Sequence, residues 1–456
     1  MFGLFETGFQ FFYWGNALML LIAGGLIYLG IGKKMEPLLL VPIGFGILLA
    51  NLPLGGLMDY ELQITNTAGA PAKVISIEVG EASSLGENDV IIRLDSGEVV
   101  APISGRLKAI NVYPGQDVVS GEVLAVMVTT AQTNQAEIPT TPVGLLSRIF
   151  AYGIMWQVIP PLIFLCLGAL TDFGPMLANP KTLLLGAAAQ FGVYFAFFAA
   201  LVTNFFRTDG FSIAEAASIG IIGGAEGPTT IYVTSLLAPH IIGATAVACY
   251  TYMALVPIIQ PPIIRLLTTK KERAIHMKPQ LREVSMREKV LFPVITAVIV
   301  ILFVPMAAPL IGMFMVGNLF VASGVTERLS KTSQTVFIDI LTIFLTLSIG
   351  ATMTAQNFLL PKTLLVLFLG IVAFATATAA GILMAKLMNL FSKQKVNPMI
   401  GAAGVSAVPM AARVVQAMGQ KANPRNFLLM HAMGPNVAGA IGAAIAGGVF
   451  LGMIGG

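Results

Sequence analysis

A single carboxylate, Glu226, stands inside an apolar stretch of the chain, in the segment GGAEGPTT that begins at Gly223. We expect one helix to stop at the glycines and a second to begin at Pro228, because proline needs no backbone donor in a first turn. A carboxylate, the hydroxyls of Thr229 and Thr230 and free carbonyl groups are hard oxygen ligands, suited to Na+ or a proton. The alternative is that Glu226 caps a helix start.

A second interruption, GVSAVPMAAR from Gly404, carries Ser406, Pro409 and Arg413. Irregular backbone at membrane depth is tolerated where it is buried in protein or lines a cavity, and ionisable groups there usually mark an ion path. The guanidinium of Arg413 is suited to hold an anionic substrate through two hydrogen bonds. A lone arginine near a helix start can also simply extend its charge to the membrane surface.

The two interruptions belong to a repeat. The sequence PKTLL of residues 180–184 recurs at 361–365, and Pro228 and Pro409 are separated by the same 181 residues. Paired interruptions at matching positions of two halves indicate a midplane binding site in a transporter. We therefore expect two structurally repeated halves that each contribute one broken helix. The residues leave open whether the copies are parallel or inverted.

The segment that follows the first interruption adds a candidate proton carrier. Tyr252, which precedes Pro257, has a phenol that could act as an ion ligand or proton relay, although a tyrosine in a membrane helix is more often a packing or interfacial residue. The corresponding segment of the second half runs from His431 to Asn436 before Val437.

The composition predicts a polytopic membrane protein. The 456 residues are 56% hydrophobic and 11% charged, against roughly 25% charged in soluble domains. Counting broken helices, we expect nine to eleven membrane segments. The apolar runs of spanning length lie near residues 17–32, 145–170, 182–205, 240–264, 290–320, 335–350, 362–391 and 426–455, with shorter ones near 38–52, 211–225 and 397–412.

Several classes of site and partner are not expected. The three histidines are scattered and the two cysteines, Cys166 and Cys249, lie in apolar segments, so neither a transition-metal site nor a disulfide framework is predicted. The net charge of +4 comes from loops and suggests no nucleic-acid partner. The N-terminus lacks the pattern of a removable signal peptide.

Basic residues mark the expected cytoplasmic side. They cluster between Arg265 and Lys289, and by the positive-inside rule this loop faces the cytoplasm of a multi-pass protein of the cell inner (cytoplasmic) membrane. A docking surface for a soluble partner is the alternative role. The predicted parts are N-terminal membrane segments (1–58), an inserted β domain (60–138), membrane repeat 1 (143–270), a basic cytoplasmic loop (271–289) and a connecting segment with membrane repeat 2 (290–456).

Residues 60–138 break the membrane pattern. Alternation such as VISIEV from Val74 reads as half-buried strand, and glycines punctuate the segment as in a small all-β unit. The stretch VVAPISGRLKAINVYPGQDVVSGEVLAVM from Val99 resembles half of a biotinyl/lipoyl carrier domain. That family carries its modified lysine in the hairpin before the Ala-Pro pair, where this chain has Asp95-Ser96-Gly97-Glu98. We expect a lysine-less barrel-sandwich that carries no biotin or lipoate and serves assembly or docking.

The membrane segments resemble the β subunits of sodium-translocating biotin-dependent decarboxylases, a family that includes the oxaloacetate, methylmalonyl-CoA and glutaconyl-CoA decarboxylase pumps. The resemblance rests on long ungapped motifs and is expected to leave only the β domain outside. The motifs are ASIGIIGGAEGPTTIYVTSLLAP from Ala217, YTYMALVPIIQPP from Tyr250, NPMIGAAGVSAVPMAARVVQ from Asn397 and LLMHAMGPNVAG from Leu428.

The resemblance implies a membrane-embedded enzyme that decarboxylates carboxybiotin, couples CO2 release to Na+ export and consumes a proton. Biotin would be carried by a carrier/carboxyltransferase subunit, within a complex that also holds a small membrane γ/δ-type subunit and further copies of this chain. The family's essential aspartate falls at Glu226, one methylene longer here. The other implied site residues match the family and are Tyr252, Asn397, Gly401, Ser406, Arg413 and Asn436.

In the mechanism so implied, Arg413 orients the carboxylate of carboxybiotin. Glu226 and the pair of Ser406 and Tyr252 bind Na+, with Asn397, Gly401 and Asn436 as further ion-site residues, and Tyr252 and Ser406 deliver the proton. The rival class is a non-enzymatic secondary transporter, such as a Na+/H+ antiporter, whose broken helices bind ions without chemistry. Composition and repeat alone do not separate the two; the motifs and Arg413 favour the decarboxylase.

Overall fold

The structure is a computed structural model of the chain, and it describes residue 9 and residues 12–66, 71–81, 83–130, 140–206, 210–277, 282–392 and 394–455. The chain divides into two compact units, one made of residues 1–13 and 49–151 and the other of residues 14–48 and 152–456. Residues 131–139 at the end of the expected β domain, and Lys278 of the expected cytoplasmic cluster, lie outside the described residues.

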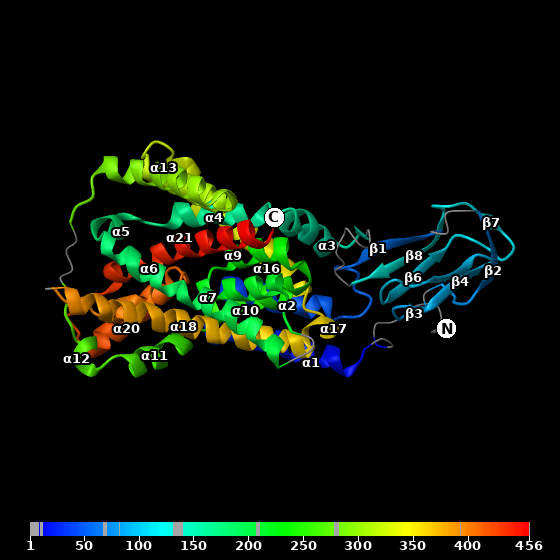
Figure 1. Cartoon of the computed structure of the whole chain (residues 1–456), viewed down its shortest axis with the longest axis horizontal. Helices are drawn as coiled ribbons and strands as arrows, with labels where there is room; N and C mark the ends of the chain where they lie inside the picture. Colours follow the sequence, from blue (N-terminus) through cyan, green and yellow to red (C-terminus); the bar gives the residue numbers. More distant parts are fainter. Residues whose placement is uncertain are drawn as a thin grey trace. The chain divides into compact units, whose positions relative to one another are not determined.

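The first unit holds two antiparallel sheets (Figure 1). A five-stranded sheet has the order β3-β6-β8-β1-β9 and a four-stranded sheet the order β5-β4-β2-β7. Their inward-facing side chains, such as Val74, Leu107 and Leu124, form one buried core. The strands are β1 (Tyr60–Thr65), β2 (Ala72–Ile77), β3 (Ser84–Leu85), β4 (Val90–Leu94), β5 (Gly97–Val100), β6 (Gly105–Ile110), β7 (Asp117–Val118), β8 (Val123–Thr129) and β9 (Thr140–Pro142).

The expected all-β unit is therefore present, but the expected barrel is not closed. The two sheets remain separate in the described residues, and register shifts such as that between Val74 and Ser76 interrupt the ladders. Asp95 and Ser96 form the turn between β4 and β5, and the Asp95 carboxylate accepts a hydrogen bond from the Lys73 N–H at 2.9 Å. Lys108, on β6, forms an ion pair with Glu61.

The second unit is helical (Figure 1). Its helices are α1 (Trp14–Ile31), α2 (Pro37–Ala50, which runs two residues into the first unit), α4 (Ile159–Leu170), α5 (Gly174–Ala178), α6 (Leu183–Ala189), α7 (Phe191–Val202), α8 (Ile213–Gly220), α9 (Gly227–Leu237), α10 (Ile242–Ala254), α11 (Val256–Leu267), α12 (Lys270–Arg273), α13 (Met286–Phe303), α14 (Ala308–Ala322), α15 (Glu327–Thr332), α16 (Ile338–Ala351), α17 (Ala355–Phe358), α18 (Pro361–Phe391), α19 (Met399–Ala402), α20 (Met410–Ala422) and α21 (Leu429–Ile454). A short helix α3 (Leu145–Ile149) belongs to the first unit.

Several helices continue into short 3-10 or π-helical turns. Within the described residues these are η2 (Phe150–Met155), η3 (Pro180–Thr182), η4 (Thr203–Phe205), η5 (Ile221–Gly224), η6 (Pro239–Ile241), η7 (Pro305–Ala307) and η8 (Ser333–Phe337). Most of the 3-10 turns stand at a proline or glycine, which cannot continue an α-helix without loss.

In the part of the chain that the structure describes, six helices are long and apolar enough to cross a membrane, or up to eight if each of two bent pairs counts as one span. The bends, of 68° each, lie between residues 155 and 159 and between 254 and 256. The upper figure equals the eight apolar runs of spanning length in the sequence, and the helices Pro37–Ala50 and Ile213–Gly224 correspond to two of the shorter runs. The run expected at 290–320 is divided at Pro305 into α13 and α14.

The two segments that share the PKTLL motif run in opposite directions. In Figure 1 the chain passes through α5, α6 and α7 from the end of the helical unit that holds α12, whereas α18 begins beside α17 at the other end and returns. The two segments are in close contact, since a Cβ at Gly192 on α7 would lie 2.6 Å from the Ala373 carbonyl oxygen on α18.

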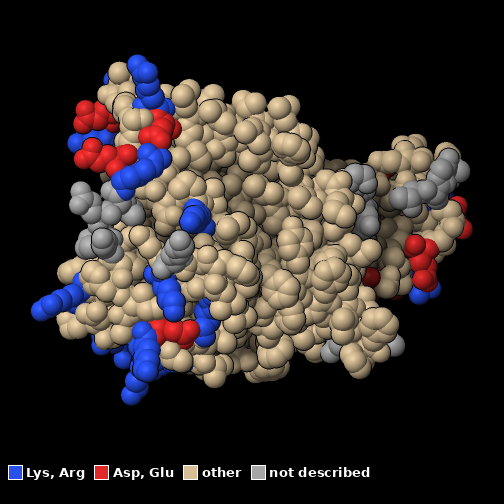
Figure 2. Space-filling model, turned by 60° about the vertical axis from the view of Figure 1, so that its left-hand side comes forward, with Lys and Arg blue, Asp and Glu red and all other residues tan. Residues whose placement is uncertain are grey.

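Charged side chains gather at one end of the helical unit. Figure 2 shows Lys, Arg, Asp and Glu together there, with a wide band of other residues beside them on the same face. Large apolar side chains lie exposed on the helices, among them Phe198, Leu302 and Phe368 at 61%, 76% and 61%. Exposure of this kind suits a surface that faces lipid rather than water.

Candidate functional site

The first interruption breaks a helix directly before Glu226. Helix α8 gives way to η5, and Ala225 then takes a left-handed conformation with φ +52°. Glu226 has extended backbone and precedes α9, but its side chain makes no capping hydrogen bond to that helix. Its carbonyl instead accepts the N–H and the hydroxyl of Thr230, at 2.9 and 2.8 Å. The carboxylate is thus left to interact beyond its own helix.

Ser406 of the second interruption meets that carboxylate. Its hydroxyl donates a hydrogen bond to Glu226 Oε2, and its backbone N–H donates to the Gly224 carbonyl at 3.0 Å. The residue lies between α19 and α20, in a stretch without regular helix. Glu226 and Ser406 are 3% and 1% exposed. The structure therefore brings the two interruptions, 180 residues apart, into direct contact.

Asn436 of α21 supports the second interruption from behind. Its side-chain amide donates to the carbonyls of Ala403 and Val405, at 3.1 and 2.7 Å. Its Oδ1 is buried without a hydrogen-bond partner among the described residues, as are Thr229 Oγ1 and Gln190 Oε1. Unpaired buried oxygens are costly unless something binds them. These atoms could accept a cation that the chain carries, because all three are hard oxygen ligands.

The sequence patterns did not single out Gln190 as a site residue. It stands at the joint of α6 and α7, donates to the Gly439 carbonyl of α21 at 3.2 Å, and has its Oε1 3.7 Å from where a Cβ of Gly224 would be. The only signal was a polar residue in the middle of the apolar run 182–205. Such residues in a membrane segment usually face the protein interior.

A cavity of about 350 Å³ opens beside the contact between the interruptions. Glu226, Ser406 and Tyr250 line it together with two further acids, Glu36 and Asp339. Tyr250 is 3% exposed, and its ring lies 2.4 Å from where a Cβ of Gly227 would be. Only glycine at 227 leaves room for that ring next to Glu226.

Tyr252 lies elsewhere. Its hydroxyl donates to the Leu367 carbonyl of α18, and its ring packs against Gly370. It is not among the residues that line the cavity, whereas Tyr250 is. The structure thus brings Ser406 to Glu226 but places a different tyrosine beside them. The ion-binding and proton-carrying role expected of Tyr252 stays a prediction.

Asn397 and Gly401 are placed at packing contacts. The Asn397 amide donates to the carbonyls of Arg273 and Ile275 at 2.9 and 3.0 Å, which fixes the segment after α12. Gly401 lies against Gly381 of α18, where a Cβ would come within 2.0 Å of the Gly381 carbonyl oxygen. Neither residue lines the cavity that holds Glu226.

Arg413 is exposed on the first turn of α20, close to Met410, which lines the cavity. Its positive charge lies near enough to attract the Glu36 carboxylate at the cavity wall. Within the described part of the chain, no hydrogen bond or ion pair engages its guanidinium. The donors of Arg413 are available to an anion that approaches this wall.

A family model described as the Na+-transporting oxaloacetate decarboxylase beta subunit matches residues 15–454. The oxaloacetate decarboxylase beta chain 2 of Salmonella typhi is 51% identical, over 96% of this chain and 94% of that protein. The oxaloacetate decarboxylase beta chain of Klebsiella pneumoniae is 50% identical over the same shares. The methylmalonyl-CoA decarboxylase subunit beta of Propionigenium modestum is 49% identical, over 99% of this chain and 98% of that protein.

The family model and these alignments extend along nearly the whole chain and run across residues 60–138, the segment expected to lie outside the resemblance.

Proposed function

Because the chain belongs to the family of Na+-transporting decarboxylase β subunits, we propose that it couples CO2 release from carboxybiotin on a partner subunit to Na+ export. A proton entering the site completes the reaction. The protein is a multi-pass membrane protein, and we place it in the cell inner (cytoplasmic) membrane. The acid that is decarboxylated is chosen by a soluble partner subunit.

One observation carries this proposal, namely the hydrogen bond from Ser406 to Glu226 that joins the two interruptions at the cavity. The Glu226 carboxylate offsets the charge of Na+ in surroundings of low dielectric constant, where an unpaired ion is expensive. Rotation of the Ser406 hydroxyl would expose its oxygen to the ion. Thr229, Gln190 and Asn436 each offer an oxygen that no described residue binds.

Two residues serve the substrate and the proton in this proposal. Arg413 holds the carboxylate of carboxybiotin at the mouth of the cavity, because its guanidinium has no other described partner. Proton delivery through Tyr252 and Ser406 remains part of the proposal, with Tyr250 as the tyrosine that lines the cavity. Carboxybiotin brings the carboxyl group when its carrier docks. Residues of this chain bind it, orient its carboxylate and deliver the proton.

The same family membership implies that this chain is part of a complex of several subunits. The relatives are named as beta chains and beta subunits, so this chain functions with other subunits. We propose a carrier/carboxyltransferase subunit, a small membrane γ/δ-type subunit and further copies of this chain as its partners.

The directions of the helices favour inverted halves. The α6–α7 segment and α18 share the PKTLL motif and run oppositely. Inverted repeats place matching broken helices at one midplane site and allow one half to rock against the other. We propose this arrangement for the alternating access of the Glu226 site.

Substitution of Glu226 tests the proposal. Glu226→Gln keeps the shape and hydrogen bonding but removes the charge. We expect loss of Na+-stimulated decarboxylation by the assembled complex and of Na+ uptake into inverted vesicles. Glu226→Asp, which restores the usual family residue, should retain much of both activities, and Glu327→Gln on α15 should behave as wild type.

The same experiment separates the rival classes. Wild-type activity in Glu226→Gln would remove Glu226 from the mechanism. Sodium uptake that proceeds in the purified chain without a carboxybiotin donor would instead favour the antiporter alternative.

A further inference from the structure

A second cavity, of about 570 Å³, lies at the end of the helical unit where the basic residues gather. It is formed by α11, α12 and α20, and it shares no lining residue with the cavity of Glu226. Four of its lining residues are cations, namely Arg265, Lys270, Arg273 and Lys421. Prolines of α11 and small or apolar side chains of α20 make up the rest, and none of the described residues that line it is a carboxylate.

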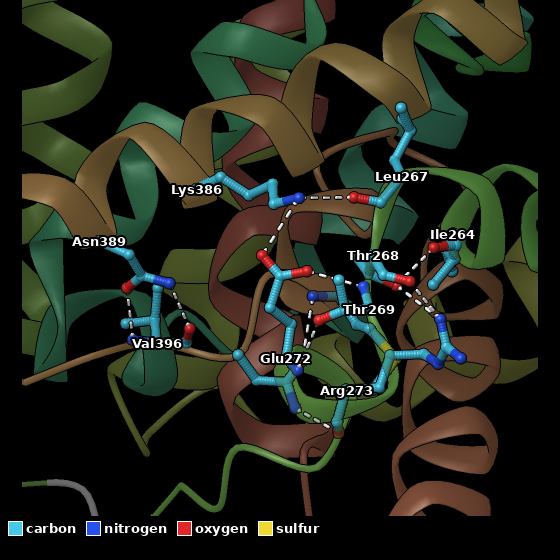
Figure 3. A network of polar contacts seen from close by, with 11 residues as sticks. Ile264, Leu267, Thr268, Thr269, Glu272, Arg273, Lys386, Asn389 and Val396 are labelled. Atoms are coloured by element: carbon cyan, nitrogen blue, oxygen red, sulfur yellow. Dashed lines mark hydrogen bonds and ion pairs between the residues drawn. The ribbon is translucent and has the colours of Figure 1, made fainter.

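The positive charge of this cavity is not neutralised by the acid nearest to it. Figure 3 shows Glu272 turned toward α18, where its carboxylate pairs with Lys386 at 3.1 Å. Glu272 also accepts the Thr269 N–H at 2.7 Å as part of a capping box for α12. Among the described residues, none of the four cavity cations takes part in an ion pair.

Arg273 is fixed in place by the same network. Its Nη1 donates to the carbonyl and the hydroxyl of Thr268, the latter at 3.2 Å (Figure 3). Its Nε and Nη2 donors have no described partner. Because one edge of the guanidinium is anchored, less side-chain entropy is lost when the other edge binds an anion. The cavity thus contains one anchored fork of donors and three further cations.

The cavity also borders a surface suited to lipid. Ile258 and Leu266 of α11 are 58% and 84% exposed, and Leu266 follows Arg265 directly. An apolar wall beside uncompensated cations at one end of a membrane bundle matches a phospholipid, whose phosphate and acyl chain need the two surfaces together. Basic pockets between membrane helices on the cytoplasmic side bind such head groups. A soluble acidic protein would have no use for the exposed apolar side chains.

We propose that this cavity binds the phosphate head group of an anionic phospholipid from the cytoplasmic leaflet. Arg273 donates to the phosphate through its free edge, and Lys270, Lys421 and Arg265 add charge. The acyl chains lie along the exposed face of α11. The inference does not depend on the proposed function, since it concerns neither Na+ nor carboxybiotin.

Lipid binding to the full chain tests this proposal. The chain is reconstituted in phosphatidylcholine nanodiscs, and retention of added phosphatidylglycerol is measured by native mass spectrometry after release. The test variant is Lys270→Gln combined with Lys421→Gln. The matched control is Lys271→Gln, which removes a charge from the adjacent, exposed position that does not line the cavity.

We expect the double variant to bind phosphatidylglycerol about 25-fold more weakly, since each basic residue at the membrane surface contributes about 1 kcal/mol, which is about fivefold. Lys271→Gln should stay within about twofold of wild type. Equal loss in the control, or equal retention of phosphatidylcholine and phosphatidylglycerol, would overturn the proposal.

Two further arms distinguish the source of the anion. Inorganic phosphate should displace phosphatidylglycerol only weakly, because it cannot use the apolar wall. Displacement at equal concentration would overturn the lipid assignment in favour of a free anion. An acidic soluble subunit that competes with phosphatidylglycerol in wild type but not in the double variant would mark the cavity as a protein contact instead.

Discussion

Arg413 is the residue whose substitution best separates an enzyme from a simple ion transporter. Its planar guanidinium can grip a carboxylate with two hydrogen bonds, whereas lysine offers a point charge. We expect Arg413→Lys to reduce decarboxylation sharply and Arg413→Ala nearly to abolish it in the assembled complex. Na+ binding to the isolated chain should survive both changes, because the ion-binding oxygens lie around Glu226.

The exposed Arg425 beyond α20 provides the control for the lost charge, and Arg425→Ala should keep normal turnover. Unchanged decarboxylation in Arg413→Ala would remove the substrate role. Equal loss of Na+ binding and decarboxylation would mark Arg413 as a structural partner of the acids at the cavity.

The two tyrosines of α10 should differ in their effects. Tyr250 lines the cavity with Glu226, whereas the Tyr252 hydroxyl is held by the Leu367 carbonyl. We expect Tyr250→Phe to raise the Na+ concentration required for half-maximal decarboxylation, since it removes a polar atom from the site. Tyr252→Phe should leave that Na+ concentration unchanged, slow decarboxylation because the proposed proton carrier is lost, and lower thermal stability by about 1 kcal/mol for one buried hydrogen bond. The opposite pattern in Na+ titration and melting curves would restore Tyr252 to the ion site.

Sequence could identify the polar residues of this site but not which way each one faces. Glu226 and Ser406 were predicted from the glycines and prolines around them, because those residues mark breaks in the backbone. Tyr250 and Tyr252 stand two positions apart on one helix, so they point about 200° away from each other. Only the packing of α10 against α18 decides which of them reaches the cavity.

At the scale of helices, Gly401 is a contact point between α19 and α18. A Cβ there would approach the Gly381 carbonyl oxygen to 2.0 Å, so the helices must separate to admit it. We expect Gly401→Ala to destabilise the protein by about 1–3 kcal/mol, as overpacking typically does. The measurement is the melting temperature of the purified chain in detergent.

Gly25 of α1 is the matched control, because nothing lies within 4 Å of a Cβ built there. Gly25→Ala should leave the melting temperature unchanged or raise it slightly, since alanine favours a helix. A normal melting temperature together with lost Na+ activation in Gly401→Ala would assign Gly401 to the ion site rather than to packing.

Apolar runs located the membrane helices but not their interruptions. The run at 290–320 reads as continuous, yet Pro305 begins a tighter turn that separates α13 from α14. The runs at 145–170 and 240–264 each contain a bend of 68°. Hydropathy records how apolar a segment is, and it does not show where neighbouring helices allow the chain to turn.

At the scale of the whole molecule, the β unit tests whether this chain carries its own biotin. Its β4–β5 turn is Asp95-Ser96, and the chain has no lysine there. We expect streptavidin blotting of the purified chain to be blank while an associated subunit labels strongly. Deletion of residues 60–138 should weaken assembly more than ion binding.

A biotin adduct mapped to residues 60–138 would contradict this expectation. Lys108 is a poor substitute for the missing lysine because Glu61 already binds it. The sequence predicted the all-β character of this unit from alternation and glycines. It did not predict that the two sheets would stay separate, since closure depends on pairing between strand edges that no local pattern records.

The burial of Glu226 affects how easily sodium can leak back across the membrane. The carboxylate is 3% exposed and, in the structure, bound by one hydroxyl. In the proposed cycle, an empty site that turned from one side of the membrane to the other would carry a bare charge through a poorly polarisable interior, at a cost of several kcal/mol. A bound cation removes that barrier. In the proposed cycle the empty, ionised site is therefore slow to turn, and sodium can leak back only when Glu226 first takes up a cation or a proton.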